Sequence, residues 1–378
     1  MTILIIRALR EYLFMSSLWR KFSPDLRRYE GISDQAEEAL GKVLWDSRSR
    51  YLINFNGSQK VSHFYMGSLL APVFHVLSTD QSQQLVQTAE RELVAPGIGV
   101  RAVMPPDFHT DSVRAFFHFA GNEAGDPCLY FNGGVWHHNN AWYVLALRAI
   151  GRVNDAFGFF RPTMTLDGIS RSPRGQPAMY EYRFSDPASP EYGRIDKPSY
   201  LWGAGFTLYA AYRLIGIDEN EWNISFSEEF PKSLDSATCS LEFLGEKRII
   251  RKERGNGALI FVADRDTIPS LVIPLDLAST SSWVLQRGHS TVPTLTKINA
   301  ILQSARFKSK TRELKFLTSS FSGHTVSATV VAPTRPHAVT VDGKSTKEFR
   351  LHAAKDGRVE ITLRFAGSNL KQSVILKF

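Results

Sequence analysis

The chain has 378 residues, of which 43% are hydrophobic and 22% are charged. These proportions exclude a disordered or fibrous protein, and the length suits one large globular domain and a smaller one. The formal net charge is +8, but the basic residues gather in separate runs, within 7–28, 247–254 and 306–315. Because no nucleic-acid motif or interleaved aromatic residues accompany these runs, we expect solvated faces and no nucleic-acid partner.

The N-terminal stretch "MTILIIRALREYLFM" has the apolar look of a secretion signal. Arg7 and Arg10 interrupt the apolar run, however, and no small-residue cleavage site follows. The stretch is also too short and too charged to span a bilayer. We therefore predict an amphipathic helix within residues 1–30, packed on the protein body rather than lying at a membrane surface.

The two cysteines, Cys128 and Cys239, are far apart in the sequence and lack the spacing of a metal site. We expect no disulfide bridge between them, no metal and no cofactor. Unpaired thiols fit a reducing compartment, although an exported protein without disulfides would look the same. Together with the missing signal peptide, this predicts a cytoplasmic protein.

Helical periodicity dominates from residue 31 to about residue 216. One segment, 78–94, starts with the capping residues Ser78, Thr79 and Asp80 and continues with apolar residues at helical spacing. Pro72 is expected to kink or restart a helix in the apolar segment before it. The predicted helical segments are 34–46, with a cap at Ser33 or Asp34, then 63–77, 78–94, 135–150, 155–164 and 199–217.

Beyond residue 222 the pattern changes to alternating runs rich in β-branched residues, which are typical of strands. The segment 341–344, Val-Asp-Gly-Lys, predicts a tight hairpin turn of the Asp-Gly kind. The sequence therefore predicts three parts. These are an N-terminal helix region at 1–30, a helical domain at 31–221 and an antiparallel β-sandwich domain at 222–378.

One segment, "NGGVWHHNNAW" at 132–142, contains Asn, Gly, His and Trp in place of the apolar residues that are typical of a buried helix. Asn and Gly weaken helix interiors, whereas the following "YVLALRAIG" is a plain amphipathic helix. The polar segment is therefore predicted to lie where a loop enters a helix.

The order of several motifs carries a family resemblance. Asn132, Gly133 and Gly134, with His138 four residues on, open a helix; Glu181 follows in "YEYRFSDPASPEYGR", and then come "SYLWGAGFTLYAAYRLIGI" and "FPKSLDSATCSLEFLGEKRI". In this order the stretch from about 36 to 245 resembles the C-terminal part of the catalytic region in cellobiose and chitobiose phosphorylases. Two further stretches look more like the glycogen-debranching amylo-alpha-1,6-glucosidases, namely "MGSLLAPVFHVL" and "RELVAPGIGVRAV".

Both families share a six-hairpin (α/α) toroid. The resemblance therefore implies an all-α (α/α)6-type toroid, followed here by the β-sandwich domain. A full toroid has twelve helices, and the sequence predicts about seven. We expect an incomplete toroid, which could be a partial barrel, a truncated gene product or half of a complex. Self-association or a partner would then complete the barrel.

The resemblance also implies an oligosaccharide or polysaccharide substrate. In the phosphorylases a Thr-Gly pair helps to bind phosphate, and the matching positions here are Leu201 and Trp202. Leu201 lacks a hydroxyl donor, and Trp202 fills space where the backbone must approach an anion. A glycoside hydrolase with water as acceptor is therefore favoured over a disaccharide phosphorylase.

Hydrolysis with inversion needs one carboxyl group to protonate the leaving oxygen and a second to activate water. Glu181 is the candidate base, on a loop between Tyr180 and Tyr182. The family's general-acid Asp lies upstream of the matched part, so the acid is not placed. Alternatively, Glu181 forms a salt bridge with Arg183 or Arg194. Three further carboxylates of this loop are alternative candidates, although residues of this kind more often cap turns or face solvent, namely Asp186, Glu191 and Asp196.

His137 and His138 do not predict a metal site, because adjacent helical residues point about 100° apart. His138 is expected to contact a sugar hydroxyl or an anion at the helix N-terminus, and the alternative is a core histidine bonded to a carbonyl. Tryptophan rings could stack on a sugar or pack between helices, and packing is expected for Trp142. The predicted substrate-binding residues are Asn132, Trp136, His138, Tyr180 and Trp202.

We expect Trp136, His138, Glu181 and Trp202 to converge on one cleft, because loops at one end of inner toroid helices meet around the axis. Two functions from different classes follow. The first is a glycoside hydrolase that acts on a gluco-oligosaccharide or polysaccharide. The second is a non-catalytic carbohydrate-binding remnant of such an enzyme, which keeps the cleft but lacks the acid.

Overall fold

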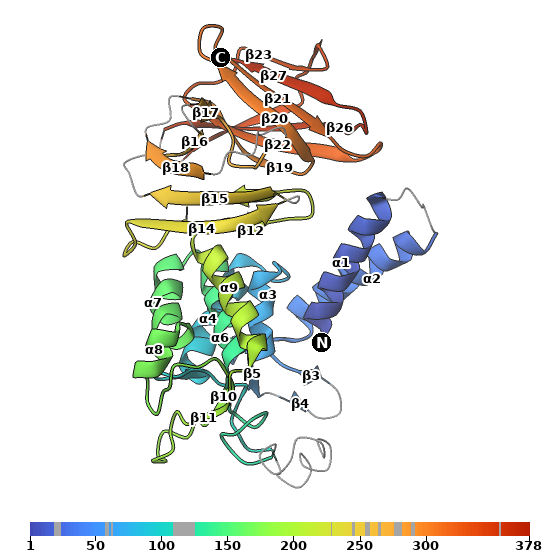
Figure 1. Cartoon of the computed structure of the whole chain (residues 1–378). Coiled ribbons are helices and arrows are strands. Elements are labelled where there is room, and N and C mark those ends of the chain that lie inside the picture. The colour runs from blue at the N-terminus through green and yellow to red at the C-terminus, as the bar shows by residue number, and fades with distance from the viewer. Residues whose placement is uncertain are drawn as a thin grey trace. The chain divides into compact units, whose positions relative to one another are not determined.

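The computed structural model divides the chain into two compact units, which we name the helical unit (Met1–Leu214) and the β unit (Ile215–Phe378) (Figure 1). The structure describes the following residues: 1–18, 24–56, 60–61, 63–108, 125–227, 229–243, 246–253, 258–263, 266–275, 282–288, 292–354 and 357–378.

Eight α-helices lie within the described part of the helical unit. In chain order they are α1 (Thr2–Leu18), α2 (Pro24–Lys42), α3 (Leu70–Val73), α4 (Thr79–Glu92), α6 (His137–Ala149), α7 (Val153–Met164), α8 (Leu166–Arg171) and α9 (Leu201–Leu214), and a 3-10 turn, η1 (Met66–Leu69), precedes α3. Helix α6 contacts α3, α7 and α9. It is therefore buried on most of its circumference, including Asn139 and Asn140.

One hydrophobic cluster joins these helices. It includes Leu85 and Ala89 of α4, Val144 of α6, Phe160 of α7 and Leu214 of α9. The α4 residues recur at helical spacing, so one stripe of the helix faces the cluster. The cluster fixes where the N-terminus of α6 lies, and that terminus begins the candidate site.

The capping chemistry predicted near residue 78 is present. Ser78 Oγ accepts a hydrogen bond from the Gln81 amide at 3.2 Å, and Gln81 Oε1 accepts one from the Ser78 amide at 3.3 Å. This reciprocal capping box satisfies two amide groups that have no partner within a helix. Helix α4 therefore begins where the sequence predicted.

The helices differ from the prediction in several places. The segment 63–77 contains only the 3-10 turn η1 and the four-residue helix α3 in place of a long helix, with Pro72 inside α3. Helix α2 begins at Pro24 and not at a cap near Ser33, because proline is well suited to the first turn and the polar residues after it still form good helix. Helix α8 was missed. It is only six residues long and contains Gly168, but the Thr165 hydroxyl caps it by accepting from the Gly168 amide at 3.0 Å.

Helix α1 packs on the helical unit. Ile3 and Ile6 are buried in the same cluster as Leu40, and one Arg10 guanidinium nitrogen donates to the Phe74 carbonyl oxygen at 2.9 Å. Of the helices in the described ranges, none has the length and apolar character needed to cross a membrane.

The helical unit is not purely helical, which corrects the all-α expectation. Its loops pair in short antiparallel ladders, the largest of which has three strands in the order β11-β10-β9. These strands are β9 (Val135–Trp136), β10 (Tyr180–Arg183) and β11 (Ile195–Pro198). The reason is that long buried loops must find partners for their backbone N–H and C=O groups. All four residues of β10 are buried.

The remaining ladders of the helical unit have two strands each. They pair β1 (Trp45–Asp46) with β2 (Tyr51–Leu52), β3 (Phe55–Asn56) with β4 (Lys60–Val61), β5 (Phe64–Tyr65) with β8 (Val103–Met104), and β6 (Val94–Ala95) with β7 (Gly99–Val100).

The β unit begins with the pair β12 (Ile217–Glu219) and β13 (Ile224–Phe226) and a five-stranded sheet. In spatial order this sheet is β14 (Ser236–Phe243), β15 (Glu246–Glu253), β18 (Ser282–Gly288), β16 (Ala258–Ala263) and β17 (Asp266–Ile268). Strands β15 and β18 run parallel, so this sheet is mixed rather than wholly antiparallel. A crossover connection between the two strands allows this, since only antiparallel neighbours can be joined by a short hairpin.

Two antiparallel sheets follow and share one core. The first has the order β19 (Thr294–Ile298), β22 (Thr325–Ala332), β26 (Val359–Ala366) and β25 (Phe349–Ala353). The second has the order β20 (Ile301–Lys308), β21 (Glu313–Ser319), β27 (Gln372–Lys377), β23 (Ala338–Val341) and β24 (Lys344–Ser345). Alternate side chains from both sheets meet in this core, for example Val330 and Phe316. Asp342 and Gly343, both with positive φ, form the predicted turn between β23 and β24.

A buried lysine holds the start of the β unit together. Lys252 of β15 is almost completely buried, and its Nζ donates to three backbone carbonyl oxygens, of Ile215 at 2.9 Å, Ser227 at 2.8 Å and Glu229 at 2.5 Å. Gly216 has a φ of +77°, and a Cβ there would lie 2.7 Å from this Nζ. The ammonium group thus takes a space that only glycine leaves open.

Candidate functional site

The two glycines of the 132–142 segment let the chain pass close to itself. Gly133 has a φ of +100°, and a Cβ on Gly134 would lie 2.6 Å from the Tyr130 amide nitrogen. The Gly134 amide donates to the Tyr130 carbonyl oxygen at 3.1 Å. Only residues without a side chain allow this approach. The turn carries the chain into β9 and then into α6, which begins at His137.

The asparagines of the segment bind the protein's own backbone. Asn132 has no exposed surface, and its side-chain amide donates to the carbonyl oxygens of Gly125 at 3.0 Å and Phe108 at 3.2 Å. Asn140 accepts from the Val100 amide at 2.8 Å and donates to the Tyr180 hydroxyl at 3.1 Å. Asn132 and Tyr180 therefore support the candidate site from inside the protein.

The two histidines have different surroundings. His137 is buried, and its Nε2 lies 2.7 Å from the Thr207 hydroxyl of α9. Burial lowers the pKa of His137 to about 3, so its imidazole is neutral. A Cβ on Gly203 would lie 2.6 Å from this ring. His137 is therefore a packing residue between α6 and α9.

His138 is half-buried within a set of aromatic rings. Its ring centroid lies 5.3 Å from that of Trp136, 5.1 Å from that of Trp142 and 5.8 Å from that of Phe206. Burial lowers the pKa of His138 to about 4, so the ring is neutral at pH 7. Among the residues that the structure describes, no group forms a hydrogen bond or an ion pair with the His138 ring.

Glu181 is buried, with 8% of its surface exposed. Its Oε1 accepts from the Tyr130 hydroxyl at 3.3 Å, and its Oε2 lies 3.0 Å from Lys197 Nζ. The salt bridge predicted with Arg183 or Arg194 is thus made by Lys197 instead. The register explains this, because Tyr180 pairs with Pro198 and Tyr182 with Asp196, so that Glu181 and Lys197 are cross-strand neighbours.

The two arginines have other partners. Arg183 Nε donates to the Gly193 carbonyl oxygen at 2.8 Å, and Arg194 lies 3.8 Å from Glu191. The other three carboxylates of the loop have local partners, as expected. Asp186 accepts from the Ala188 amide, Glu191 pairs with Arg174 at 3.0 Å, and Asp196 accepts from the Lys197 amide.

Aromatic rings surround Glu181 and its partners. We name Tyr130, Phe131, Trp136 and Tyr182 the ring cluster. Within it, the centroid of Tyr130 lies 4.7 Å from that of Trp136 and 5.1 Å from that of Tyr182, distances at which rings attract one another. Lys197 Nζ lies 5.2 Å from the Tyr130 centroid. Burial raises the pKa of Tyr130 to about 12, so its hydroxyl keeps the proton that it donates to Glu181.

Trp202 lies at the start of α9 and is 60% exposed. Its ring centroid lies 5.9 Å from that of Phe206, which in turn contacts His138. The structure thus brings Trp136 and His138 into direct contact. Phe206 lies between Trp202 and His138 and contacts both. Tyr130 in the same way contacts both Glu181 and Trp136.

The sequence did not predict three participants, namely Tyr130, Lys197 and Phe206. Tyr130 lies two residues before the Asn-Gly-Gly motif, and this nearness is the signal that could have found it. Lys197 becomes visible only once 180–198 is recognised as a hairpin.

A cavity of about 300 Å³ lies against Trp142, one ring contact away from His138. Its lining is largely apolar but includes the side chains of Asn54, Tyr65 and Ser68, and the N-terminal residues of α1 form one wall. It offers a concave surface beside the rings, and its size is at the lower end for small-molecule sites.

No protein-family model matches the chain, and no curated protein matches it in sequence. In contrast, several solved structures are similar to parts of this chain. A GH63 mannosylglycerate hydrolase from Thermus thermophilus, in complex with glucose, is 18% identical with a TM-score of 0.38, and the match covers 56% of this chain and 43% of that one. A sialidase is 14% identical with a TM-score of 0.48, covering 67% and 23%. Neutral trehalase from Saccharomyces cerevisiae is 16% identical with a TM-score of 0.28, covering 49% and 32%.

This chain spans less than half the length of each of these proteins. Each of these matches has a TM-score below 0.5 and an identity below 20%, and each covers between about half and two thirds of this chain. Identities and TM-scores this low describe a distant, partial similarity and assign no activity.

Proposed function

We propose that this protein is carbohydrate-active and that it hydrolyses glycosidic bonds of a gluco-oligosaccharide or polysaccharide, with inversion. The observation that carries the proposal is the placement of Glu181. Its carboxylate is buried beside the ring cluster, where the Tyr130 hydroxyl and the Lys197 ammonium fix both oxygens. An anchored carboxylate beside aromatic faces is what a glycosidase base requires.

The surrounding side chains suit sugar recognition. Sugar sites combine aromatic faces with a few polar groups. Trp136 and the exposed Trp202 supply such faces, and neutral His138 supplies ring nitrogens that can bond a hydroxyl group. In this proposal Asn132 and Tyr180 shape the wall from behind.

The proximity of Lys197 to Glu181 supports the role of a base rather than an acid. A general acid must carry its proton, which burial without a cation favours, whereas a base must be ionised. Lys197 compensates the charge of an ionised Glu181 at 3.0 Å. The acid would be a second carboxyl group about 6.5–9.5 Å away, and we propose that a second copy or a partner that completes the toroid supplies it.

The salt bridge also favours a second candidate function, carbohydrate binding without hydrolysis. A carboxylate held by Lys197 on one oxygen and by Tyr130 on the other has less freedom to receive a proton from water. In this alternative the ring cluster and His138 retain the ligand, and Glu181 serves to orient Tyr130.

The test measures release of reducing sugar from neutral gluco-oligosaccharides, and binding of the same sugars by calorimetry. For the hydrolase, Glu181→Gln should lower the rate about 10²- to 10⁴-fold, as loss of a general base does, and leave binding within a few fold. The matched control is Glu191→Gln, the same change at a partly exposed carboxylate of the same loop, which should alter neither quantity. Binding by the wild-type protein without turnover would establish the second candidate. Equal loss of binding and turnover in Glu181→Gln would show a structural residue.

A further inference from the structure

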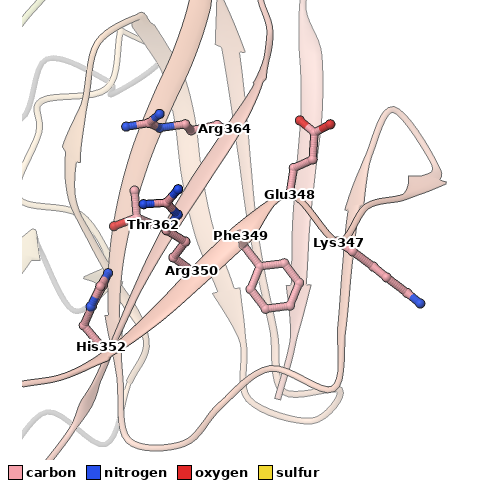
Figure 2. Close-up of a pocket in the computed structure, with 7 residues that line it drawn as sticks. All are labelled: Lys347, Glu348, Phe349, Arg350, His352, Thr362 and Arg364. Carbon is pink, nitrogen blue, oxygen red and sulfur yellow. The ribbon is translucent and has the colours of Figure 1, made fainter.

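The β unit has a basic concavity whose lining residues take no part in the candidate site. It has a volume of about 520 Å³ and is lined by Lys347, Glu348, Phe349, Arg350, His352, Thr362 and Arg364 (Figure 2). Three lining residues carry a fixed positive charge, and one carries a negative charge. The volume lies within the range of small-molecule sites.

Strand register places its key side chains on one face. Arg350 of β25 pairs with Thr362 of β26. Because side chains alternate between faces, His352 and Arg364 share the face of Arg350 and Thr362. The intervening Ile361 and Leu363 are buried in the sandwich core, so the four polar side chains lie on the outer face. Figure 2 shows Arg350 beside Thr362, with Arg364 further along the strand, while Lys347 extends away from them.

The two guanidinium groups lack the partners that other arginines of this chain have. Arg152 pairs with Glu90 at 2.9 Å, and Arg251 pairs with Glu253 at 2.7 Å. In the described ranges, by contrast, neither Arg350 nor Arg364 takes part in an ion pair or a side-chain hydrogen bond. Diagonal neighbours in an antiparallel pair are about 7–8 Å apart, so the two like charges repel each other.

Acidic side chains on the same face do not cancel this charge. Glu348 lines the concavity, and Glu360 lies opposite His352 in the register. Neither is within ion-pair distance of a guanidinium group of Arg350 or Arg364 in the described structure. An oxyanion between the two arginines would bond both planar forks and remove their repulsion.

We propose that this concavity binds an oxyanion, a phosphate or carboxylate group carried by a small molecule, clamped between Arg350 and Arg364. Thr362 donates a third hydrogen bond, and His352 closes one side. Phe349 carries the one benzene ring among the lining residues of the described ranges, and it is half-buried. Charge rather than stacking therefore selects the ligand, and the inference is independent of the activity proposed for Glu181.

The test compares four probes by calorimetry at low ionic strength: inorganic phosphate, glucose 6-phosphate, glucuronate and glucose. We expect millimolar or tighter binding of at least one anionic probe, weakened by added salt. Binding of both phosphate probes identifies a phosphate site, and binding of glucuronate alone identifies a carboxylate site. Glucose shares the sugar of the anionic probes but lacks their charge, so any glucose binding should not respond to changes at the two arginines.

Variants locate the site. Arg350→Gln and Arg364→Gln should each weaken binding of the anionic probe about tenfold or more, since each removes a charge-assisted fork. Arg350→Lys keeps the charge and should retain part of the affinity. The matched control is Arg306→Gln, an exposed arginine of β20 outside the concavity, which should bind as the wild type does. Failure of every anionic probe to bind, or unchanged binding by the Arg350→Gln, Arg364→Gln double variant, would overturn the proposal.

Discussion

His138 and His137 make the stability of the helical unit depend on pH. Burial holds their pKa values at about 4 and about 3, below the ordinary value of about 6.5 for an unfolded chain. The unfolded state therefore binds more protons than the folded state as the pH falls below about 6.5. The contribution of the neutral histidines to the free energy of unfolding should be complete above that pH and should be lost as the pH falls toward 4. For His138 the loss is about 3 kcal/mol.

We predict that the free energy of unfolding decreases from pH 7 to pH 4 and that His138→Phe flattens this decrease. Urea denaturation at a series of pH values measures it. His337→Gln, a change at an exposed histidine, should leave the slope as in the wild type. An unchanged slope in His138→Phe would mean that this ring is protonated without cost.

Gly134 is a residue at which a single methyl group should matter. A Cβ there would meet backbone atoms of Tyr130 at 2.6 Å and 2.8 Å, and backbone cannot rotate away as a side chain can. Gly134→Ala should therefore lower the free energy of unfolding by about 1–3 kcal/mol. Gly158→Ala is the matched control, because no atom lies within 4 Å of its Cβ position inside helix α7. That change should stabilise the protein by about 0.5–1 kcal/mol. Similar effects of both changes would contradict the close packing at Tyr130.

At the scale of elements, the hairpin formed by β10 and β11 joins Glu181 to Lys197. Glu181 is buried, whereas the Lys197 side chain is 47% exposed. Solvent therefore screens the pair, and its coupling should be about 1 kcal/mol rather than the larger value of a fully buried bridge. A double-mutant cycle with Glu181→Gln and Lys197→Met, followed by urea denaturation, measures this coupling. Additive effects of the two changes would show that the pair does not stabilise the hairpin.

Elements with a local signal were predictable. The capping box at Ser78 and the periodic stretch after it specify α4 without any distant contact. The Asp342-Gly343 turn specifies its hairpin in the same way. Helix α8 was not predictable, because a six-residue helix containing Gly168 has too little periodicity to be detected.

The site was predictable only in part for a related reason. Trp136, His138 and Glu181 stand in motifs, but the ion-pair partner of Glu181 is fixed by strand register. The sequence between 184 and 194 is rich in turn-forming residues, with two Pro, two Ser, one Asp and one Gly, and nothing in it specifies which residue will face Glu181. Arg183 and Arg194 were chosen for their charge and nearness in sequence, whereas the register selects Lys197.

For the whole molecule, the two units have separate hydrophobic clusters. The cluster of the helical unit contains residues from Ile3 to Leu214, and that of the sandwich contains residues from Val272 to Leu376. A unit with its own core can fold alone. We predict that the fragment 215–378 is folded and unfolds cooperatively, with a β-type circular dichroism spectrum.

The matched fragment carries Lys252→Met, which removes the donor to three carbonyl oxygens and leaves them buried. Unsatisfied buried acceptors cost about 1–3 kcal/mol each, so its midpoint of thermal unfolding should be clearly lower. A non-cooperative melt of the unaltered 215–378 fragment would show that the β unit needs the helical unit in order to fold.

Lys252 also sets an order of folding events during synthesis of the chain. Ile215, Ser227 and Glu229 leave the ribosome before Lys252, whose ammonium group joins their carbonyl oxygens. Domains generally fold as units as the chain emerges, the N-terminal one first. The helical unit can therefore complete its core before the carbonyl oxygens at the start of the β unit have received hydrogen bonds from Lys252. A nascent chain whose strand β15 has not yet emerged from the ribosome would leave these carbonyl oxygens without their donor and expose the segment to proteases, whereas a chain whose β15 has emerged would protect it.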